Sequence, residues 1–67
     1  MLIITYDISN TKLRSKFSRF LEKYGHRLQF SVFEIKNSPR ILTQIQLEIS
    51  HVFEKKFSED DSIIILI

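Results

Sequence analysis

The segment Thr5-Tyr6-Asp7-Ile8-Ser9 is where an apolar strand ends and a helix begins, and it places a carboxylate at that junction. Residues 2–7 alternate as a strand whose even-numbered side chains face one side and whose odd-numbered side chains face the other. Ser9 or Asn10 can cap the helix that follows. Ligands and catalytic groups collect at the carboxyl ends of strands, so Asp7 is a candidate site residue. Its alternative role is that of a turn or capping residue.

Two helices are indicated by the spacing of apolar residues. The first follows Asn10, and its apolar stripe consists of Leu13, Phe17, Phe20, Leu21 and Tyr24. Gly25 stands where a helix C-cap takes a positive φ angle. The second helix is expected from about Pro39 to Phe57, with Ser38 as its N-cap. Its buried stripe is expected to comprise Ile41, Leu42, Ile45, Ile49, Val52 and Phe53.

Residues 27–35 alternate with no turn residue among them, which predicts a single strand. Its first face would carry Leu28, Phe30 and Val32. Its second face would carry Arg27, Gln29, Ser31, Phe33 and Ile35. An arginine on that face can fork onto a phosphate, and an exposed Phe33 can stack on a base. The alternative is that this face is a half-polar dimer interface.

The last strand has no polar alternation, because Ser62 is followed by five aliphatic residues that end at Ile67. Such strands are usually covered on both faces. The order strand–helix–strand–helix–strand is typical of an α+β or split β-α-β sandwich. Two helices cover only one face of a small sheet, so we expect the other face to meet a second copy of the chain.

Length and composition limit what the chain can be. Its 67 residues form one domain, 1–67, with a small core that benefits from a second subunit. The absence of cysteine excludes disulfides and thiolate metal sites and fits a cytoplasmic protein. The N-terminal apolar run is too short for a signal peptide or a membrane span, so we expect no membrane association. The net charge of +2 is weak evidence for nucleic acid.

The distribution of charge on the first helix is more informative. A row of cations spaced by four, three and four residues consists of Lys12, Lys16, Arg19 and Lys23. Such a ridge suits a run of phosphates, because each neutralised phosphate releases a counterion. The alternative is a solvated helix face. Arg14 lies across the apolar stripe from this row and is expected near the strand ends.

Three stretches together point to a family: Tyr6-Asp7-Ile8-Ser9, then Lys12-Leu13-Arg14, then Leu21-Glu22-Lys23-Tyr24-Gly25-His26-Arg27-Leu28-Gln29-Phe30-Ser31-Val32-Phe33-Glu34. In them the chain resembles the CRISPR-associated Cas2 family, small proteins of prokaryotic adaptive immunity. The resemblance implies a ferredoxin-like β-α-β-β-α-β sandwich, with one more strand between residues 27 and 38. It also implies a homodimer whose sheets face each other. Relatives usually continue into a further strand that locks the dimer, which we expect this chain to lack after Ile67.

The resemblance also implies a function in CRISPR adaptation. Family members act with an integrase partner to insert new DNA spacers, and several have been described as magnesium-dependent endonucleases on RNA or DNA. The family's catalytic positions fall on Asp7, Tyr6, Arg14, Arg27 and Phe33. Asp7 would hold Mg²⁺, and a symmetric dimer could bring two copies of this carboxylate together.

Several alternatives remain open for the function. The nucleic acid could be duplex DNA lying across the dimer or single-stranded RNA. A virulence-associated ribonuclease toxin has a related fold. A non-catalytic nucleic-acid-binding module is the third possibility, and it would present paired aromatic side chains on its sheet.

Overall fold

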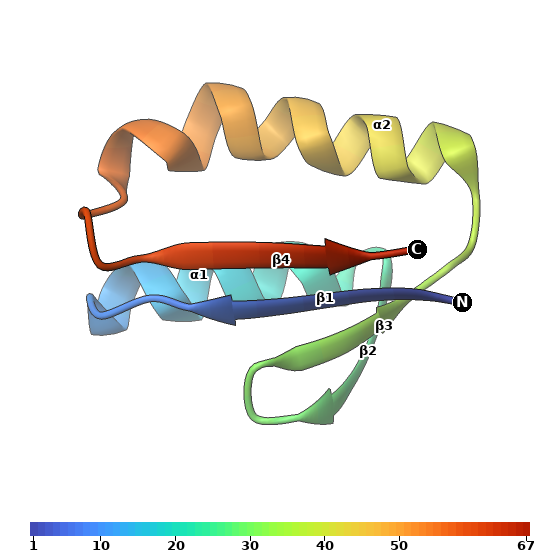
Figure 1. The fold of residues 1–67 in the computed structure, drawn as a ribbon, viewed down its shortest axis with the longest axis horizontal. Coiled ribbons are helices and arrows are strands. Elements are labelled where there is room, and N and C mark those ends of the chain that lie inside the picture. Colours follow the sequence, from blue (N-terminus) through green and yellow to red (C-terminus); the bar gives the residue numbers. More distant parts are fainter.

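The computed structural model describes residues 1–67, which form a four-stranded sheet and two helices in β-α-β-β-α-β order (Figure 1). The elements are β1 (Leu2–Asp7), α1 (Thr11–Glu22), β2 (Gly25–Gln29), β3 (Val32–Ile35), α2 (Pro39–Glu48) and β4 (Ser62–Leu66). The strands lie in the order β2-β3-β1-β4, and all neighbours are antiparallel. This is the ferredoxin-like α+β architecture that the family resemblance implied.

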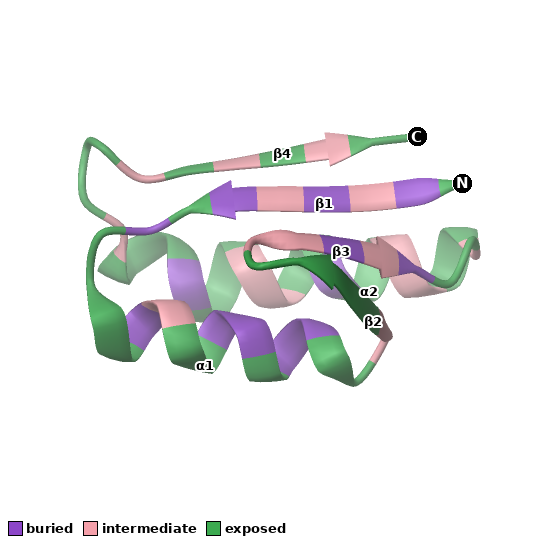
Figure 2. Cartoon of the chain, turned by 90° about the horizontal axis from the view of Figure 1, so that it is seen from below, coloured by how far each residue is buried: buried purple, intermediate pink, exposed green.

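Both helices cover the same face of the sheet, as Figure 2 shows, and the opposite face is left open. The even-numbered residues of β1 point into the core between the sheet and the helices, as their alternation predicted. The whole core consists of twelve buried apolar side chains: Leu2, Ile4, Tyr6, Ile8, Leu13, Phe17, Phe20, Leu21, Phe33, Ile35, Ile45 and Phe53. Odd-numbered residues of β1 lie on the open face.

The starts of both helices agree with their capping residues. The side chain of Asn10 accepts a hydrogen bond from the Leu13 backbone N–H at 2.9 Å, and Ser38 accepts one from Ile41 at 3.4 Å. Pro39 occupies the start of α2, where its missing N–H costs no hydrogen bond. These local signals therefore place both helices correctly.

The prediction of one strand over residues 27–35 is wrong. The chain turns at Phe30 and Ser31, so β2 and β3 form a hairpin, and a bulge between Arg27 and Gln29 shifts the register. The turn reverses the expected pattern of burial: Phe33 is fully buried, whereas Phe30 is 74% exposed. No glycine, proline or asparagine marks this turn. It is supported by tertiary pairing, since the Tyr6 N–H donates to the Ser31 carbonyl at 3.2 Å.

Gly25 does not act as the helix C-cap that its position suggested. No residue of the chain has a positive φ angle, and Gly25 begins β2 opposite Ile35. A Cβ atom at this position would overlap the backbone carbonyl of Glu34. The glycine is therefore required by the close approach of two strands.

The second helix ends near its predicted boundary but changes its winding on the way. After α2 the chain forms a π-helical turn, η1 (Ile49–Phe53), and a 3₁₀ turn, η2 (Glu54–Lys56). The wider π turn alters the helical period, so Phe53 is buried while Val52 is 43% exposed. Including Val52 in the buried stripe was therefore wrong. No helix in the chain combines the length and the apolar character needed to cross a lipid bilayer.

The strand β4 lies at one edge of the sheet, beside β1. Ile63 and Ile65 pack against the core, whereas Ile64 and Leu66 are 52% and 55% exposed on the open face. The register pairs Leu66 with Ile3. The open face is therefore apolar at this edge, and no part of the single chain covers it.

Candidate functional site

The sheet separates the predicted site residues onto two faces. Asp7 ends β1 opposite Ser62 and is exposed on the open face. Tyr6 points to the opposite, helix-covered face and is only 5% exposed. Asp7 and Tyr6 therefore cannot act together on one small group within a single chain.

Phe33 is a core residue, and the expectation that it could stack on a base is wrong. Its exposure is 0%, and its ring centroid lies 6.2 Å from that of Tyr6. The hairpin turn places it on the helix-covered face, opposite Arg27 in the register. The guanidinium carbon of Arg27 lies 5.1 Å from the centre of the Phe33 ring, so Phe33 supports the arginine instead.

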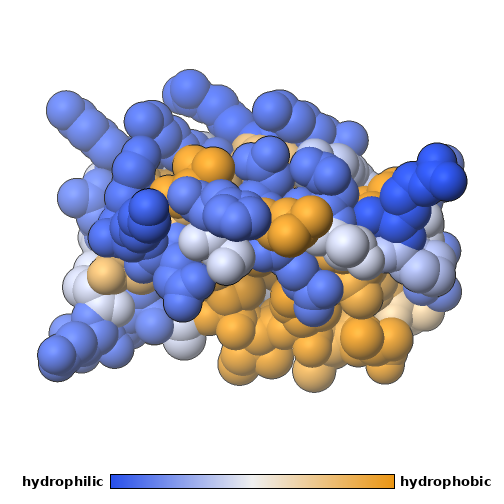
Figure 3. All heavy atoms as spheres, turned by 90° about the horizontal axis from the view of Figure 1, so that it is seen from above, coloured by the Kyte–Doolittle hydropathy of each residue, from blue (hydrophilic) through white to orange (hydrophobic).

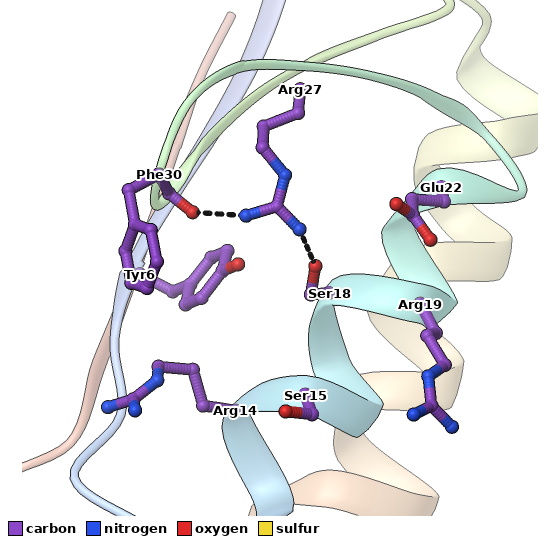
Figure 4. A pocket seen from close by; sticks show the side chains of 8 residues that line it. All are labelled: Tyr6, Arg14, Ser15, Ser18, Arg19, Glu22, Arg27 and Phe30. Carbon is purple, nitrogen blue, oxygen red and sulfur yellow. Dashed lines mark hydrogen bonds between the residues drawn. The ribbon is translucent and has the colours of Figure 1, made fainter. Parts of the chain in front are cut away.

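A hollow of about 320 Å³ lies between α1 and the β2–β3 turn, and Figure 4 shows the side chains that surround it. We call it the arginine hollow. It is lined by Tyr6, Arg14, Ser15, Ser18, Arg19, Glu22, Arg27 and Phe30. Three of these side chains are cationic and one is anionic, so the hollow carries an excess of positive charge. It brings together three of the predicted catalytic positions and leaves Asp7 outside.

Two hydrogen bonds hold the exposed side chain of Arg27 at the edge of the arginine hollow. Its Nη1 donates to the Phe30 carbonyl at 2.7 Å, and its Nη2 donates to the Ser18 hydroxyl (Figure 4). The arginine thereby ties the β2–β3 turn to α1. Two of its five N–H groups are used in these bonds, and the others remain for a ligand. Ser18 was missed by sequence reasoning, because a small polar residue inside an apolar stripe gives no signal.

Arg14 lies near the carboxyl end of β1, as expected. Its Nη1 donates to the Ile8 carbonyl at 3.2 Å, and its Nη2 approaches the Thr11 hydroxyl at 3.5 Å. The guanidinium carbon is 6.0 Å from the centre of the Phe30 ring. Phe30 was expected on an apolar strand face, and its exposed position at the rim of the hollow was missed.

The cationic row on the first helix is exposed as predicted. We call it the α1 stripe, and it comprises Lys12, Lys16, Arg19 and Lys23. None of these side chains forms an ion pair, since the chain's one ion pair joins His26 to Glu34 at 3.5 Å. Arg19 belongs to both the α1 stripe and the arginine hollow. The two therefore form one continuous cationic surface on α1.

The carboxylates of the chain do not gather into a metal site. No group of three or more histidine, aspartate or glutamate side chains is close enough to hold an ion. Asp7 offers one carboxylate, which is fewer ligands than an isolated protein site for Mg²⁺ needs without other oxygen donors. The donor set of one chain therefore fits the ion only if a second copy or a substrate phosphate adds ligands.

Asp61 has a structural role that the sequence did not reveal. Its Oδ1 accepts hydrogen bonds from the Ser9 N–H at 3.0 Å and the Ser9 hydroxyl at 3.1 Å, and its Oδ2 accepts one from the Ser58 N–H at 2.9 Å. The backbone hydrogen bond from Ser9, followed by that from Ser58, lowers the pKa of Asp61 below its ordinary value. The carboxylate thus ties the loop after Asp7 to the loop before β4.

Comparison with known proteins agrees with the observed fold. A family model described as CRISPR associated protein Cas2 matches residues 1–67. The CRISPR-associated endoribonuclease Cas2 3 of Synechocystis sp. is 35% identical over 63 residues, which cover 94% of this chain and 65% of that protein. The chain spans less than two thirds of the length of the curated relatives it matches.

Two solved structures share the architecture. Streptococcus pyogenes Cas2 superposes with a TM-score of 0.78 at 28% identity, over 98% of this chain and 82% of that chain. A chain of a partial Cas6-RT-Cas1–Cas2 complex superposes with a TM-score of 0.81 at 35% identity, over 97% of this chain and 73% of that chain.

Proposed function

Because the chain belongs to the Cas2 family of CRISPR-associated proteins, we propose that it acts in CRISPR adaptation as a DNA-binding subunit beside an integrase. The integrase partner is supported by the similar chain found in a complex with Cas1. The observation that carries DNA binding is the α1 stripe, whose four cations are exposed and free of ion pairs. Cations arranged in this way gain free energy mainly by releasing counterions from phosphates.

Salt dependence tests this proposal. We expect the logarithm of the affinity for blunt duplex DNA to fall linearly with the logarithm of salt concentration, as fluorescence anisotropy can measure. Lys16→Gln should lower the slope by about 1, because one phosphate contact is lost. Arg40→Gln removes an exposed charge from α2 and is the matched control. An affinity that hardly changes between low and moderate salt would refute the role of the α1 stripe.

We also propose that two copies pair through the open face of the sheet. Ile3, Ile64 and Leu66 lie together at the β4 edge of this face, and Figure 3 shows hydrophobic atoms gathered along that side of the molecule. Contiguous exposed apolar surface of this kind is typical of interaction sites. A two-fold axis would bring the same patch of each copy together. It would also place both Asp7 carboxylates on the shared interface.

A second candidate function is cleavage of nucleic acid at that interface. It is favoured by the exposure of Asp7 at the strand end and by relatives that are named endoribonucleases. Mg²⁺ held there would activate water and stabilise the charge that develops on a phosphodiester. The chain's own contribution would be one carboxylate ligand from each copy.

Substitution of the carboxylate tests cleavage. Asp7→Asn should abolish magnesium-dependent cleavage of single-stranded RNA and duplex DNA while leaving duplex binding intact. Asp60→Asn changes another exposed acid and is the control. If Asp7→Asn protein, freed of contaminants, cleaves as fast as the unmodified protein, the nuclease proposal fails and the binding role stands.

The other two alternatives have less support. The match to the Cas2 family model over the whole chain favours adaptation over a virulence-associated toxin. A sheet-based RNA-binding module needs exposed phenylalanine or tyrosine side chains on its strands. The open face carries none, and the exposed Phe30 lies in a turn.

A further inference from the structure

The arginine hollow lies on the helix-covered side of the sheet, away from the open face and from Asp7. Its volume of about 320 Å³ falls at the small end of the range for ligand pockets. Figure 4 shows the Tyr6 hydroxyl pointing into it from β1, with Arg27 above and α1 beside it. The site is therefore a concave surface that the proposed pairing of two open faces does not cover.

The charge of the hollow suits a phosphate. Arg14, Arg19 and Arg27 line it with a single acid, Glu22, which forms no ion pair. Guanidinium groups bind phosphate oxygens through parallel N–H bonds. Arg27 is already fixed by its bonds to Ser18 and the Phe30 carbonyl, so little side-chain entropy remains to be lost when an anion binds.

Phe30 adds an apolar surface at the rim of this charged hollow. Phe30 is 74% exposed, the most exposed phenylalanine or tyrosine in the chain. A lone exposed hydrophobic residue is ordinary, but this ring lies at the rim of a hollow that three arginines line, and its centre is 6.0 Å from the Arg14 guanidinium carbon. A flat apolar ring beside phosphate-binding groups is the combination that holds single-stranded nucleotides.

We propose that the arginine hollow is a subsite for one unpaired nucleotide, with its phosphate on Arg27 and Arg19 and its base stacked on Phe30. A base inside a duplex is already stacked on its neighbours and cannot reach this ring, so the subsite distinguishes single-stranded tails from blunt duplex. The inference rests on the proposed binding of nucleic acid. Because Arg19 joins the hollow to the α1 stripe, a tail leaving a duplex on the stripe could enter the hollow directly.

The test compares one duplex with blunt ends against the same duplex with a short single-stranded tail, by fluorescence anisotropy at fixed salt. We expect the tailed duplex to bind more tightly, by roughly fivefold to a hundredfold for one stacked base. Phe30→Ala should abolish this gain and leave blunt-duplex binding unchanged, whereas Phe30→Trp should preserve it. Leu47→Ala, an exposed apolar residue on α2, is the matched control and should keep the gain.

The outcomes separate this inference from the proposed function. The nucleotide subsite is overturned if the unmodified protein binds both duplexes equally, or if Phe30→Ala keeps the preference for the tail. It is also overturned if Phe30→Ala weakens both duplexes by the same factor. If the unmodified protein does not bind the blunt duplex, the role of the α1 stripe is refuted instead. Binding of the tailed duplex in that case would still support the subsite.

Discussion

At the scale of single residues, Gly25 and Asp61 have structural roles that their residue types alone do not indicate. Gly25 is needed because the β3 backbone passes too close for a side chain, although it lies where a helix cap was expected. Asp61 joins two loops that are 52 residues apart in sequence through its bonds to Ser9. Neither role follows from local sequence, since each depends on a distant partner.

Gly25→Ala should destabilise the fold. Alanine normally stabilises a non-helical glycine position slightly by restricting the unfolded chain, but here its Cβ would meet the Glu34 carbonyl. We expect the free energy of unfolding to fall by about 1–3 kcal/mol. Urea denaturation measures the change, and Asn37→Ala, at an exposed position after β3, is the control. Unchanged stability would contradict the close approach.

Asp61 should make stability depend on acid pH. Hydrogen bonds lower the pKa of the Asp61 carboxyl in the folded state. The contribution of this carboxylate to stability is therefore complete above the pKa of the unfolded chain, near 4. That contribution is lost as pH falls through the lower, folded pKa. Urea midpoints from pH 7 to pH 2 should therefore fall less steeply for Asp61→Asn than for the unmodified chain. Asp60→Asn should follow the unmodified chain, and identical curves for all three would exclude the role.

At the scale of elements, the β2–β3 hairpin decides where the site residues point. The turn at Phe30 and Ser31 and the bulge after Arg27 replace one continuous alternation by two short ones. A bulge shifts side chains to the opposite face of a strand. The face that Arg27 and Phe33 were expected to share is therefore the helix-covered one, and Phe30 is left in solvent at the rim of the arginine hollow.

Phe33→Leu tests whether this residue belongs to the core. The smaller side chain would leave a void beside Tyr6 and remove the ring that supports Arg27. We expect the free energy of unfolding to fall by about 1–3 kcal/mol, as is usual for loss of core packing. Phe30→Leu, at the exposed turn, should change stability by less than about 0.5 kcal/mol. If both substitutions lower the free energy of unfolding equally in chemical denaturation, the burial of Phe33 and the exposure of Phe30 are contradicted.

At the scale of the whole molecule, the two faces of the sheet have different chemistry. The helix-covered face leads to the cationic surface of α1 and the arginine hollow. The open face is apolar along β4 and the adjoining Ile3, and Asp7 lies at the carboxyl end of β1 on the same face. A second copy on the open face would leave the cationic surfaces of both copies accessible to nucleic acid.

Ile64→Lys should weaken self-association. The introduced charge would lie in the proposed interface in both copies, where it would lose water without gaining a partner. We expect the dissociation constant of the dimer to rise by at least about a hundredfold in sedimentation equilibrium. Leu47→Lys places the same charge on α2 and should leave association unchanged. Equal association of both variants would place the contact between copies elsewhere.

The local pattern of the sequence determined a large part of this protein. Alternation in β1 and the apolar spacing of α1 predicted which side chains are buried, and Asn10 and Ser38 marked where the helices begin. The exposure of the α1 stripe followed from the same spacing. These properties depend on residues within one or two turns of each other, so they are readable along the chain. The motif around Tyr6 and Asp7, together with the stretch from Tyr24 to Glu34, likewise indicated the family.

Only the tertiary structure decided the hairpin, the role of Gly25 and the gathering of Arg27 and Phe30 beside Tyr6. Residues 27–35 alternate like one strand, and the turn within them is supported by pairing with β1 and by the bonds of Arg27 to α1. Those partners lie up to 33 residues away, as for Leu2 and Ile35, so no local pattern records them. The sequence thus determined β1 and α1 with their buried faces and the start of α2. Long-range pairing decided that Arg27 and Phe30 join Tyr6 around a hollow on the helix-covered side of the sheet.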